Sequence, residues 1–389
     1  MSYRILTLNN ISARGLARLP RERYEIGAAI SRPDAILLRS ADMHALPVAP
    51  SVRAVGRAGA GVNNIPVAEL SRRGIPVFNT PGANANAVKE LVLAGLLLAA
   101  RNLGPAWLFA RSLSGDDAAI DAAVEKGKKA FVGFELPGRT LGVVGLGAIG
   151  VEVANSALAL GMKVLGYDPQ ITVQRAWQLS SNVEQALSME DLFARADAIS
   201  VHVPLNEHTR KLVNPARLAL VKKEATILNF ARAAIVDTEA ILAALDAERL
   251  HAYVCDFPSR ALKDHPKVIT LPHLGASTGE AEENCAVMVA EQLRDFLENG
   301  NIKNSVNYPE AVLPRVPNTT RISIANSNVP NMVGQISTCL AARKINIADL
   351  LNKSRGEVAY TLIDADGAVG EDLLDVIRRI DGVLAARLV

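Results

Sequence analysis

The fold of this chain is decided by residues 139–169, which read RTLGVVGLGAIGVEVANSALALGMKVLGYDP. A short apolar run, Leu141–Val144, leads into three glycines in GxGxxG order, and a helical pattern then continues to Gly161. A second apolar run follows and stops at Asp168. The order of strand, glycine turn, helix and second strand is typical of a βαβ unit in a parallel sheet.

Each position of the glycine motif has a physical reason in a dinucleotide site. Gly145 allows the tight turn, Gly147 lets a pyrophosphate approach the backbone, and Gly150 lets the helix pack close to the strand. The N-terminus of the helix attracts the phosphates. Asp168 is placed to accept hydrogen bonds from the adenosine ribose, and its charge would repel a 2′-phosphate. The motif therefore predicts NAD rather than NADP as the cofactor.

Composition limits the remaining possibilities. The chain has 389 residues, 49% of them apolar and 21% charged, which is enough for two or three globular domains. Lys plus Arg number 42 against 40 for Asp plus Glu, and no dense basic cluster with aromatics is present, so nucleic acid is a poor candidate partner. The apolar stretch 91–100 is about half of the roughly 20 residues that a membrane span needs, and we expect a buried helix there and no membrane partner.

The cysteines and the start of the chain indicate a cytoplasmic protein. Cys255, Cys285 and Cys339 are widely spaced without a CxxC pair, which predicts neither a disulfide framework nor a metal site. The first twelve residues have no long apolar core after their arginine and do not resemble a secretory signal.

Further short apolar runs alternate with helical segments, and four of them end in residues with useful chemistry. The stretches AISVHVP, ATILNF, HAYVCDF and KVITLP are followed or closed by His202, Arg232, Asp256 and His273. Open α/β sheets place ligand-contacting residues at this carboxyl edge. His202 falls inside its strand pattern, so packing or cofactor contact is the expectation there, and Asp256 could equally cap a strand end.

After residues 304–320, a linker with three prolines, the pattern changes. The remaining segment predicts strand, helix, strand, strand, helix, strand, which is the arrangement of a ferredoxin-like module.

Several of these motifs occur together in the D-isomer-specific 2-hydroxyacid dehydrogenases, and the chain resembles that family over nearly its whole length. The shared stretches are GRAGAGVNNI, GIPVFNTP, GLGAIG with GYDP, VHVPL, NFARAAIVD and PHLGAST. Within the family, the chain is most similar to members that oxidise 3-phosphoglycerate, and its end resembles an ACT domain. The resemblance implies a Rossmann-type NAD domain (89–278) inserted in a flavodoxin-like substrate domain (1–88 and 279–310), with an ACT-like regulatory domain at 320–389.

The resemblance also implies a reaction. It is the NAD-dependent oxidation of 3-phospho-D-glycerate to 3-phosphohydroxypyruvate, the first step of serine biosynthesis. Arg232 matches the arginine that holds the substrate carboxylate, and His273 matches the histidine that accepts the hydroxyl proton. In the family this histidine is paired with a glutamate, but Arg260 stands at that position here, or Ala261 if the spacing shifts by one. Asp256 or Asp264 could substitute for the glutamate, or catalysis could be weakened.

Other site residues are carried over from the same matches. The predicted cofactor-binding residues are Gly145, Gly147, Ala148, Ile149, Gly150, Asp168, His202, Pro204, Thr209, Ala231 and Asp256. The predicted substrate-binding residues around the phosphate are Arg39, Arg57, Gly59, Ala60, Gly61 and Lys129, the last reaching a neighbouring subunit's site.

The ACT-like end suggests regulation by an amino acid such as L-serine, bound between paired copies in a homodimer or homotetramer. Asn328 and Asn346 match polar positions for such a ligand, whereas Asn326 replaces a histidine and Asn331 replaces a glycine. A dimerisation module without a ligand is the alternative.

Two other functions stay open for the whole chain. One is a dehydrogenase for another D-2-hydroxy acid, and the other is a non-catalytic NAD-sensing scaffold on the same fold. The absent glutamate favours the scaffold, while Arg232 and His273 argue against it.

Overall fold

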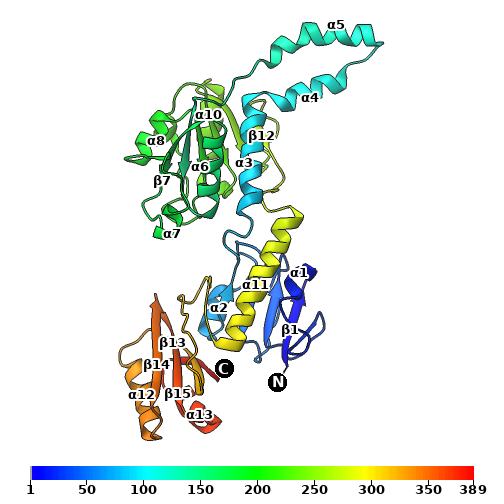
Figure 1. The fold of residues 1–389 in the computed structure, drawn as a ribbon. Helices are drawn as coiled ribbons and strands as arrows, with labels where there is room; N and C mark the ends of the chain where they lie inside the picture. Colours follow the sequence, from blue (N-terminus) through cyan, green and yellow to red (C-terminus); the bar gives the residue numbers. More distant parts are fainter. Residues whose placement is uncertain (1) are drawn as a thin grey trace. The chain divides into compact units, whose positions relative to one another are not determined.

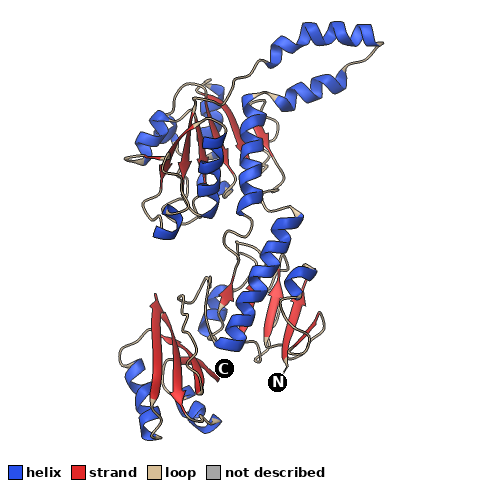
Figure 2. Ribbon diagram, in the orientation of Figure 1, coloured by secondary structure: helices blue, strands red, loops and turns tan. Residues whose placement is uncertain are grey.

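The computed structural model describes residues 2–389 and divides the chain into two compact units (Figures 1 and 2). One unit is Ala85–Thr278, and the other combines the residues up to Asn84 with Gly279–Val389. The predicted boundary between residues 88 and 89 lies within helix α3 (Ala85–Ala100), which belongs entirely to the first of these units.

A seven-stranded parallel sheet organises the unit Ala85–Thr278, with strand order β12-β11-β10-β9-β6-β7-β8. The strands are β6 (Thr140–Val144), β7 (Lys163–Tyr167), β8 (Glu184–Gln185), β9 (Ala198–Val201), β10 (Ala225–Asn229), β11 (Leu250–Cys255) and β12 (Val268–Thr270). The chain reverses its direction across the sheet at β6, which lies between β7 and β9. This is the Rossmann arrangement that the glycine motif predicted, and its ligand site lies at the carboxyl ends of the strands near that reversal.

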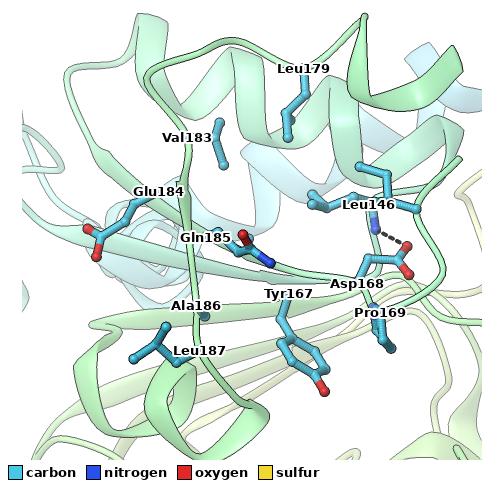
Figure 3. Close-up of a pocket in the computed structure, with 12 residues that line it drawn as sticks. Leu146, Tyr167, Asp168, Pro169, Leu179, Val183, Glu184, Gln185, Ala186 and Leu187 are labelled. Carbon is cyan, nitrogen blue, oxygen red and sulfur yellow. Dashed lines mark hydrogen bonds between the residues drawn. The ribbon is translucent and has the colours of Figure 1, made fainter. Parts of the chain in front are cut away.

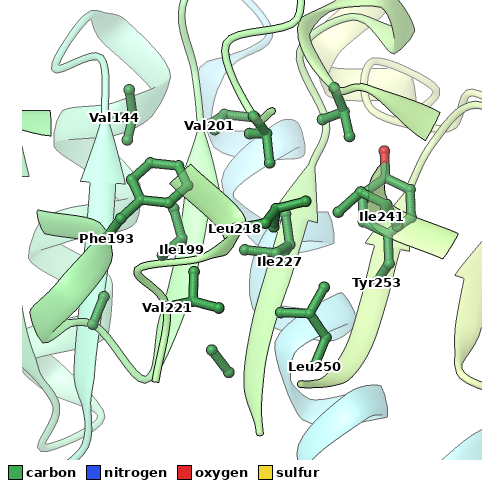
Figure 4. Close-up of a cluster of buried hydrophobic side chains, with 14 of the residues drawn as sticks. Val144, Phe193, Ile199, Val201, Leu218, Val221, Ile227, Ile241, Leu250 and Tyr253 are labelled. Atoms are coloured by element: carbon green, nitrogen blue, oxygen red, sulfur yellow. The ribbon is translucent and has the colours of Figure 1, made fainter. Parts of the chain in front are cut away.

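Helices cover both faces of this sheet, so its strands are apolar on both sides. The helices are α6 (Ala148–Ala159), α7 (Val173–Ala176), α8 (Met189–Arg195), α9 (Pro215–Leu218) and α10 (Thr238–Asp246), together with α3 and the short helix η2 (Ala233–Ile235). One face packs Phe193, Leu218 and Ile241 against the strands (Figure 4). The other face packs α3 and α6, including Val92 and Val151.

Two helices of this unit have no core of their own. They are α4 (Leu103–Ser112) and α5 (Asp117–Gly127), followed by the short helix η1 (Lys128–Phe131), and none of them contains a buried residue. Trp107 and Leu108 are 60% and 63% exposed. Figure 1 shows α4 and α5 extending away from the sheet of their own unit.

Within residues 2–389, no single helix has the length and apolar character to cross a membrane. Only α3 and α4 taken together meet that test of length and composition, and they are bent by 65° at the break between them.

The other unit begins with a five-stranded parallel sheet in the order β2-β1-β3-β4-β5. The strands are β1 (Tyr3–Leu8), β2 (Tyr24–Gly27), β3 (Ala35–Leu38), β4 (Ala54–Arg57) and β5 (Val77–Phe78). This is the flavodoxin-like order. The helices are α1 (Ala13–Leu16), α2 (Val67–Arg72) and α11 (Gly279–Asn299), and α11 lies on β4 with Val289 and Leu293 in the shared core.

The C-terminal segment forms a four-stranded antiparallel sheet in the order β14-β15-β13-β16. Its elements are β13 (Thr319–Ser327), α12 (Met332–Ala342), β14 (Ile347–Arg355), β15 (Val358–Asp366), α13 (Glu371–Arg378) and β16 (Val383–Leu388). The two helices share one apolar core with Ile322, Ile324 and Ile363. The order of elements and strands is the ferredoxin-like arrangement expected from the sequence.

The opposite face of the C-terminal sheet is buried against the rest of its unit. Tyr360 and Leu362 share a core with Phe296 and Leu297 of α11 and with Tyr308 of the linker. The hydroxyl of Tyr360 donates to the carbonyl of Gly300 at 2.7 Å. The C-terminal sheet is therefore packed directly on α11 rather than only tethered to it.

One buried arginine reinforces this junction. Arg321 of β13 is completely buried, and it makes a bidentate pair with Asp364 at 2.6 and 2.7 Å. Its remaining N–H groups donate to the carbonyls of Asn299, Leu313 and Pro314. All five donors of the guanidinium are used, which satisfies a group that would otherwise be costly to bury.

Candidate active site

The glycine turn has the geometry that its sequence spacing predicts. Gly145 adopts a φ of +91°, in the left-handed region that favours glycine. A Cβ at Gly150 would lie 1.9 Å from the carbonyl oxygen of Gly145, so only glycine lets α6 begin this close to β6. A Cβ at Gly147 would meet nothing within 4 Å, which leaves open space at the start of the helix.

Asp168 follows β7 and lies beside this turn. One carboxylate oxygen accepts the N–H of Leu146 at 2.8 Å, and the other accepts the N–H of Gln170 at 2.9 Å (Figure 3). A carboxylate has about four acceptor sites, so two remain for the hydroxyls of a ribose. The adjoining cavity has a volume of about 420 Å³. Its walls include Tyr167, Ile171 and the side chains of Leu146, Leu179 and Val183, which suit a flat apolar base.

His202 is the first residue after β9 rather than part of it, because the strand ends at Val201. Its backbone N–H donates to the carbonyl of Val144, the last residue of β6 before the glycine turn. Nε2 lies 2.8 Å from the hydroxyl of Ser200, and Nδ1 is buried without a partner among residues 2–389. Burial lowers the pKa of His202 to about 4, so the ring is neutral near pH 7.

Pro204 and Thr209 lie on the loop after β9 and belong to one turn. The hydroxyl of Thr209 donates to the carbonyl of Pro204 at 2.5 Å and accepts the N–H of Asn206 at 2.8 Å. The Asn206 side chain accepts the N–H groups of His208 and Thr209. The two predicted residues are thus brought together at the carboxyl edge, next to His202 in the chain.

The loop that carries Ala231 and Arg232 is held by an asparagine that the sequence analysis missed. Asn229, completely buried at the end of β10, donates to the carbonyl of Arg232 at 3.0 Å and accepts the N–H of Ala231 at 3.2 Å. The guanidinium of Arg232 is exposed, and within residues 2–389 it makes one hydrogen bond, a local donation to the carbonyl of Ala231. The only sequence signal for Asn229 was a polar residue closing an otherwise apolar strand.

Asp256 likewise holds the backbone of the turn that contains His273. It is 1% exposed, and its two oxygens accept the N–H groups of Leu274 and Gly275, each at 2.8 Å. His273 itself is exposed, has a φ of +57°, and meets the ring of Phe257 edge to face at 5.3 Å between centroids. The carboxylate of Asp256 therefore braces the backbone next to His273.

The family glutamate has no visible substitute in this unit. Within residues 85–278, no carboxylate forms an ion pair or hydrogen bond with the ring of His273. Asp264 pairs with Lys263, and Arg260 is exposed on the turn after β11.

Arg39 and Arg57 lie side by side in the other unit, at the carboxyl ends of β3 and β4. Nε of Arg57 donates to the carbonyl of Arg39 at 3.0 Å. Arg39 forms an ion pair with Glu282, near the start of α11, at 2.5 Å. Glu282 reduces the net positive charge next to the two arginines. The sequence analysis did not single out this residue.

The loop after β4 contains Gly59, Ala60 and Gly61. Gly59 has a φ of +153°, and the carbonyl of Ala60 accepts a hydrogen bond from Asn79 at 2.6 Å. The N–H groups of Ala60 and Gly61 bond to no acceptor in the described chain, so they are available for an anion. Lys129 belongs to the other unit, where it is exposed on η1.

The two predicted regulatory residues lie at opposite ends of the C-terminal sheet. Asn328, after β13, donates to the carbonyl of Gly356, whereas Asn346, before β14, donates to Asp366. The nine residues of β15 separate these positions by roughly 27 Å at the usual rise of a strand. One small ligand cannot contact both residues within a single chain.

The residues present fit a bound dinucleotide. An open helix start, an acid with spare acceptor sites and an apolar cavity beside it are the features that the phosphates, ribose and adenine of NAD require. No group of three or more His, Cys, Asp and Glu residues within 2–389 could hold a metal ion.

Comparison with known proteins agrees with this geometry. The sequence model for the family described as D-isomer specific 2-hydroxyacid dehydrogenase, NAD binding domain, matches residues 104–275. Fold and match together define the class of protein: an NAD-dependent oxidoreductase built on a Rossmann-type sheet.

Relatives extend the match over most of the chain. A D-3-phosphoglycerate dehydrogenase of Haemophilus influenzae is 32% identical over 357 residues, 88% of this chain and 82% of that protein. Proteins of the same name from Synechocystis and Methanocaldococcus jannaschii are both 37% identical, but this chain spans only 50% and 54% of their length. The chain belongs to the D-isomer specific 2-hydroxyacid dehydrogenase family.

Solved structures show the same architecture. The TT0316 protein from Thermus thermophilus has a TM-score of 0.62 at 28% identity, covering 78% of this chain and 99% of that one. An NAD⁺-bound 3-phosphoglycerate dehydrogenase of Entamoeba histolytica has a TM-score of 0.61 at 25% identity, covering 79% and 99%.

Proposed function

We propose that the protein oxidises 3-phospho-D-glycerate to 3-phosphohydroxypyruvate with NAD⁺. The observation that carries the proposal is the match with the Haemophilus influenzae relative, which spans most of both chains. The proposed domains are 1–88 with 279–310 for substrate, 89–278 for NAD and 320–389 for regulation.

In this mechanism, Arg232 holds the substrate carboxylate and the reacting oxygen. A planar guanidinium with paired donors suits that two-point contact, and Asn229 supports it by fixing the Arg232 backbone. The Arg232 side chain makes only a local bond to its neighbour's carbonyl, so little must be broken when substrate binds.

His273 is the proposed acid–base residue. It accepts the proton of the 2-hydroxyl as the carbon loses hydride, and it returns that proton in the reverse reaction. Bound NAD⁺ supplies the hydride acceptor. Asp256 holds the two N–H groups that follow His273, so its proposed part in catalysis is to position the turn.

The phosphate of the substrate is assigned to Arg39, Arg57 and the loop Gly59–Gly61. Two neighbouring guanidinium groups and unpaired backbone N–H groups form a typical phosphate-binding surface. Lys129 is proposed to reach the site of a neighbouring copy, in line with its place on helices that bury none of their residues.

Regulation and assembly are part of the same proposal. The proposed protein is a cytoplasmic homodimer or homotetramer with an amino acid such as L-serine as its effector. The separation of Asn328 from Asn346 supports an effector site between two copies. A ligand that contacts both residues must lie between two copies of the C-terminal sheet.

The test is NADH formation with 3-phosphoglycerate, glycerate and lactate, each with NAD⁺ and with NADP⁺. We expect 3-phosphoglycerate with NAD⁺ to have the highest kcat/KM. Arg57→Ala should raise KM for 3-phosphoglycerate more than it lowers kcat, because it removes binding to an unreacting part of the substrate.

Other outcomes point to the alternatives. Faster oxidation of an unphosphorylated D-2-hydroxy acid would replace the substrate and keep the reaction. NADH binding without any turnover would support a non-catalytic scaffold, the reading favoured by the absence of a carboxylate beside His273.

A further inference from the structure

A second cavity lies within the unit that contains the C-terminal sheet, whereas the glycine turn belongs to the unit Ala85–Thr278. It has a volume of about 300 Å³ and lies where β16 and α13 meet the segment 50–53 and the end of α2. Its lining combines apolar side chains such as Val52, Ile75 and Phe296 with the polar groups of Ser323 and Tyr360.

Four arginines line this cavity, and no acidic residue does. They are Arg53, Arg73, Arg378 and Arg387. They come from four separate segments of the chain, so folding brings four positive charges together around one small cavity. Such convergence is unfavourable unless anions balance it.

Nearby carboxylates balance this charge only in part. Arg378 pairs with Glu371 and Asp375 at 3.0 and 2.9 Å. Arg53 lies 3.6 Å from Asp34, which is too long for a hydrogen bond, and its guanidinium donates to no other described group. Arg73 lies 3.7 Å from Glu69 and donates to two backbone carbonyls.

Arg387 has no carboxylate partner among residues 2–389. It donates to the carbonyls of Phe296 and Leu297, and its guanidinium lies 4.4 Å from the centre of the Phe296 ring. Burial lowers the pKa of Arg387, the Tyr360 hydroxyl opposes that shift, and the charge of Arg53 adds to it. A partly buried cation with a second cation nearby would be stabilised by a bound anion.

We propose that this four-arginine cavity binds a phosphate dianion, either free or as part of a small phosphorylated metabolite. Guanidinium groups suit phosphate because they offer paired donors in a plane, and here they approach from several sides. The apolar wall leaves room for a short carbon skeleton beside the phosphate.

Binding at this cavity would tie together two parts of one unit. Arg53 and Arg73 belong to the region of the five-stranded sheet, whereas Arg378 and Arg387 belong to the C-terminal module. An anion held by both pairs would stabilise the packing between them. The inference does not depend on the reaction proposed above.

The test measures binding of inorganic phosphate to the full chain by titration calorimetry, at constant ionic strength set with chloride. Arg57→Gln serves as background, because it weakens the proposed substrate phosphate site and leaves this cavity intact. Phosphate should still bind to Arg57→Gln and should raise its melting temperature saturably. A parallel titration with 3-phosphoglycerate distinguishes free phosphate from a phosphorylated metabolite as the tighter ligand.

Variants locate the site. Arg53→Gln in the Arg57→Gln background should weaken phosphate binding about ten- to a hundredfold, because it removes one charged donor. Arg387→Met should do the same, and Arg53→Gln keeps the test valid if Arg387→Met does not fold. Arg379→Gln, an exposed arginine next to Arg378 that does not line the cavity, is the matched control and should change nothing.

The proposal is wrong if the Arg57→Gln protein binds neither phosphate nor 3-phosphoglycerate. It is equally wrong if Arg53→Gln and Arg379→Gln weaken binding alike, since that would indicate a general effect of surface charge.

Discussion

Two buried polar side chains determine where the proposed catalytic groups lie. Asn229 is the last residue of β10 and Asp256 directly follows β11 of the same sheet, and each bonds to the backbone of a loop at that edge. Their oxygens and nitrogens are used to hold loops, which leaves Arg232 and His273 exposed for substrate. Precise placement of these exposed residues therefore depends on residues that substrate does not touch.

His273→Ala should lower kcat by about 100- to 10,000-fold, the usual contribution of a general acid or base. The Kd for NADH should stay nearly unchanged, because the glycine turn and Asp168 are untouched. Stopped-flow hydride transfer and fluorescence titration measure the two quantities. His44→Ala, on an exposed pair with Asp42, is the control. Full activity in His273→Ala would remove the residue from the mechanism.

Arg260→Glu tests the missing carboxylate directly. A carboxylate beside the imidazole favours its protonated form. Reduction needs the protonated ring, and the reductive activity should extend to higher pH in this variant. Unchanged pH profiles, together with a loss of activity in Asp264→Asn, would indicate that Asp264 already takes that place.

His202 provides a prediction about pH and stability. Burial lowers its pKa to about 4, against about 6.5 in an unfolded chain. Between about pH 4 and 6.5 the unfolded state binds a proton at His202 that the folded state does not. The contribution of His202 to the free energy of unfolding is therefore most favourable above pH 6.5, and it is lost as the pH falls toward 4. His202→Gln should flatten that part of a plot of urea midpoint against pH. An equally steep plot in the variant would show that His202 is not responsible.

At the scale of elements, local patterns were predictable and tertiary ones were not. Gly145, Gly150 and Asp168 form a motif within one short segment, and the sequence predicted their strand, turn and helix. The bonds of Asn229 and Asp256 join strand ends to loops, and no spacing rule reveals such partners before the sheet exists. The family resemblance indicated a glutamate position near His273, but the sequence could not show that both oxygens of Asp256 accept backbone N–H groups.

A helix break illustrates the same limit. The helical pattern of the sequence predicts one long helix over about 84–103, but in the structure α3 ends at Ala100 and α4 begins at Leu103. Asn102 between them has a φ of +51°, a conformation that asparagine tolerates better than most residues. Pro105 then lies in the first turn of α4, where its missing N–H costs nothing. Apolar residues continue on both sides of this break, so the sequence pattern did not predict it.

The buried pair of Arg321 and Asp364 yields a prediction about the C-terminal module. Burial alone would raise the pKa of Asp364, but Arg321 and the N–H of Val316 lower it below its usual range. Asp364→Asn leaves the guanidinium without its counter-charge and should reduce the free energy of unfolding by about 3–5 kcal/mol. Urea denaturation measures the loss. Glu184→Gln, which removes an exposed pair with Arg195, should barely move the midpoint.

The pH dependence of the same pair has a definite sign. A carboxyl whose pKa is lowered in the folded state stabilises the protein above its ordinary pKa of about 3.9, and that contribution is lost as pH falls through the lowered value. The wild-type protein should therefore lose stability in acid more steeply than Asp364→Asn. Parallel curves for the two proteins would contradict the assignment.

At the scale of the whole molecule, α4 and α5 are helices without a core within their own chain. Helices of this kind are marginal in water unless a partner covers them. The exposed Trp107 and Leu108 on α4 provide apolar surface that the proposed homo-oligomer would cover.

Trp107→Glu should therefore shift the protein toward a smaller assembly in sedimentation velocity at micromolar concentration. Trp177→Glu is the matched control, because Trp177 is 85% exposed and lies outside these helices. An unchanged sedimentation coefficient in Trp107→Glu would exclude α4 as the subunit interface.

The discontinuous unit has a consequence for synthesis on the ribosome. Strands β1 to β5 leave the ribosome first, but α11, which covers β3, β4 and β5, is made only after Ala85–Thr278. At typical elongation rates of 5–20 residues per second, that interval lasts about 10 to 40 s. During it, the first sheet exposes the apolar face that Val289 and Leu293 later bury. While the inserted unit is being made, this open sheet is the part of the nascent chain that needs protection from aggregation.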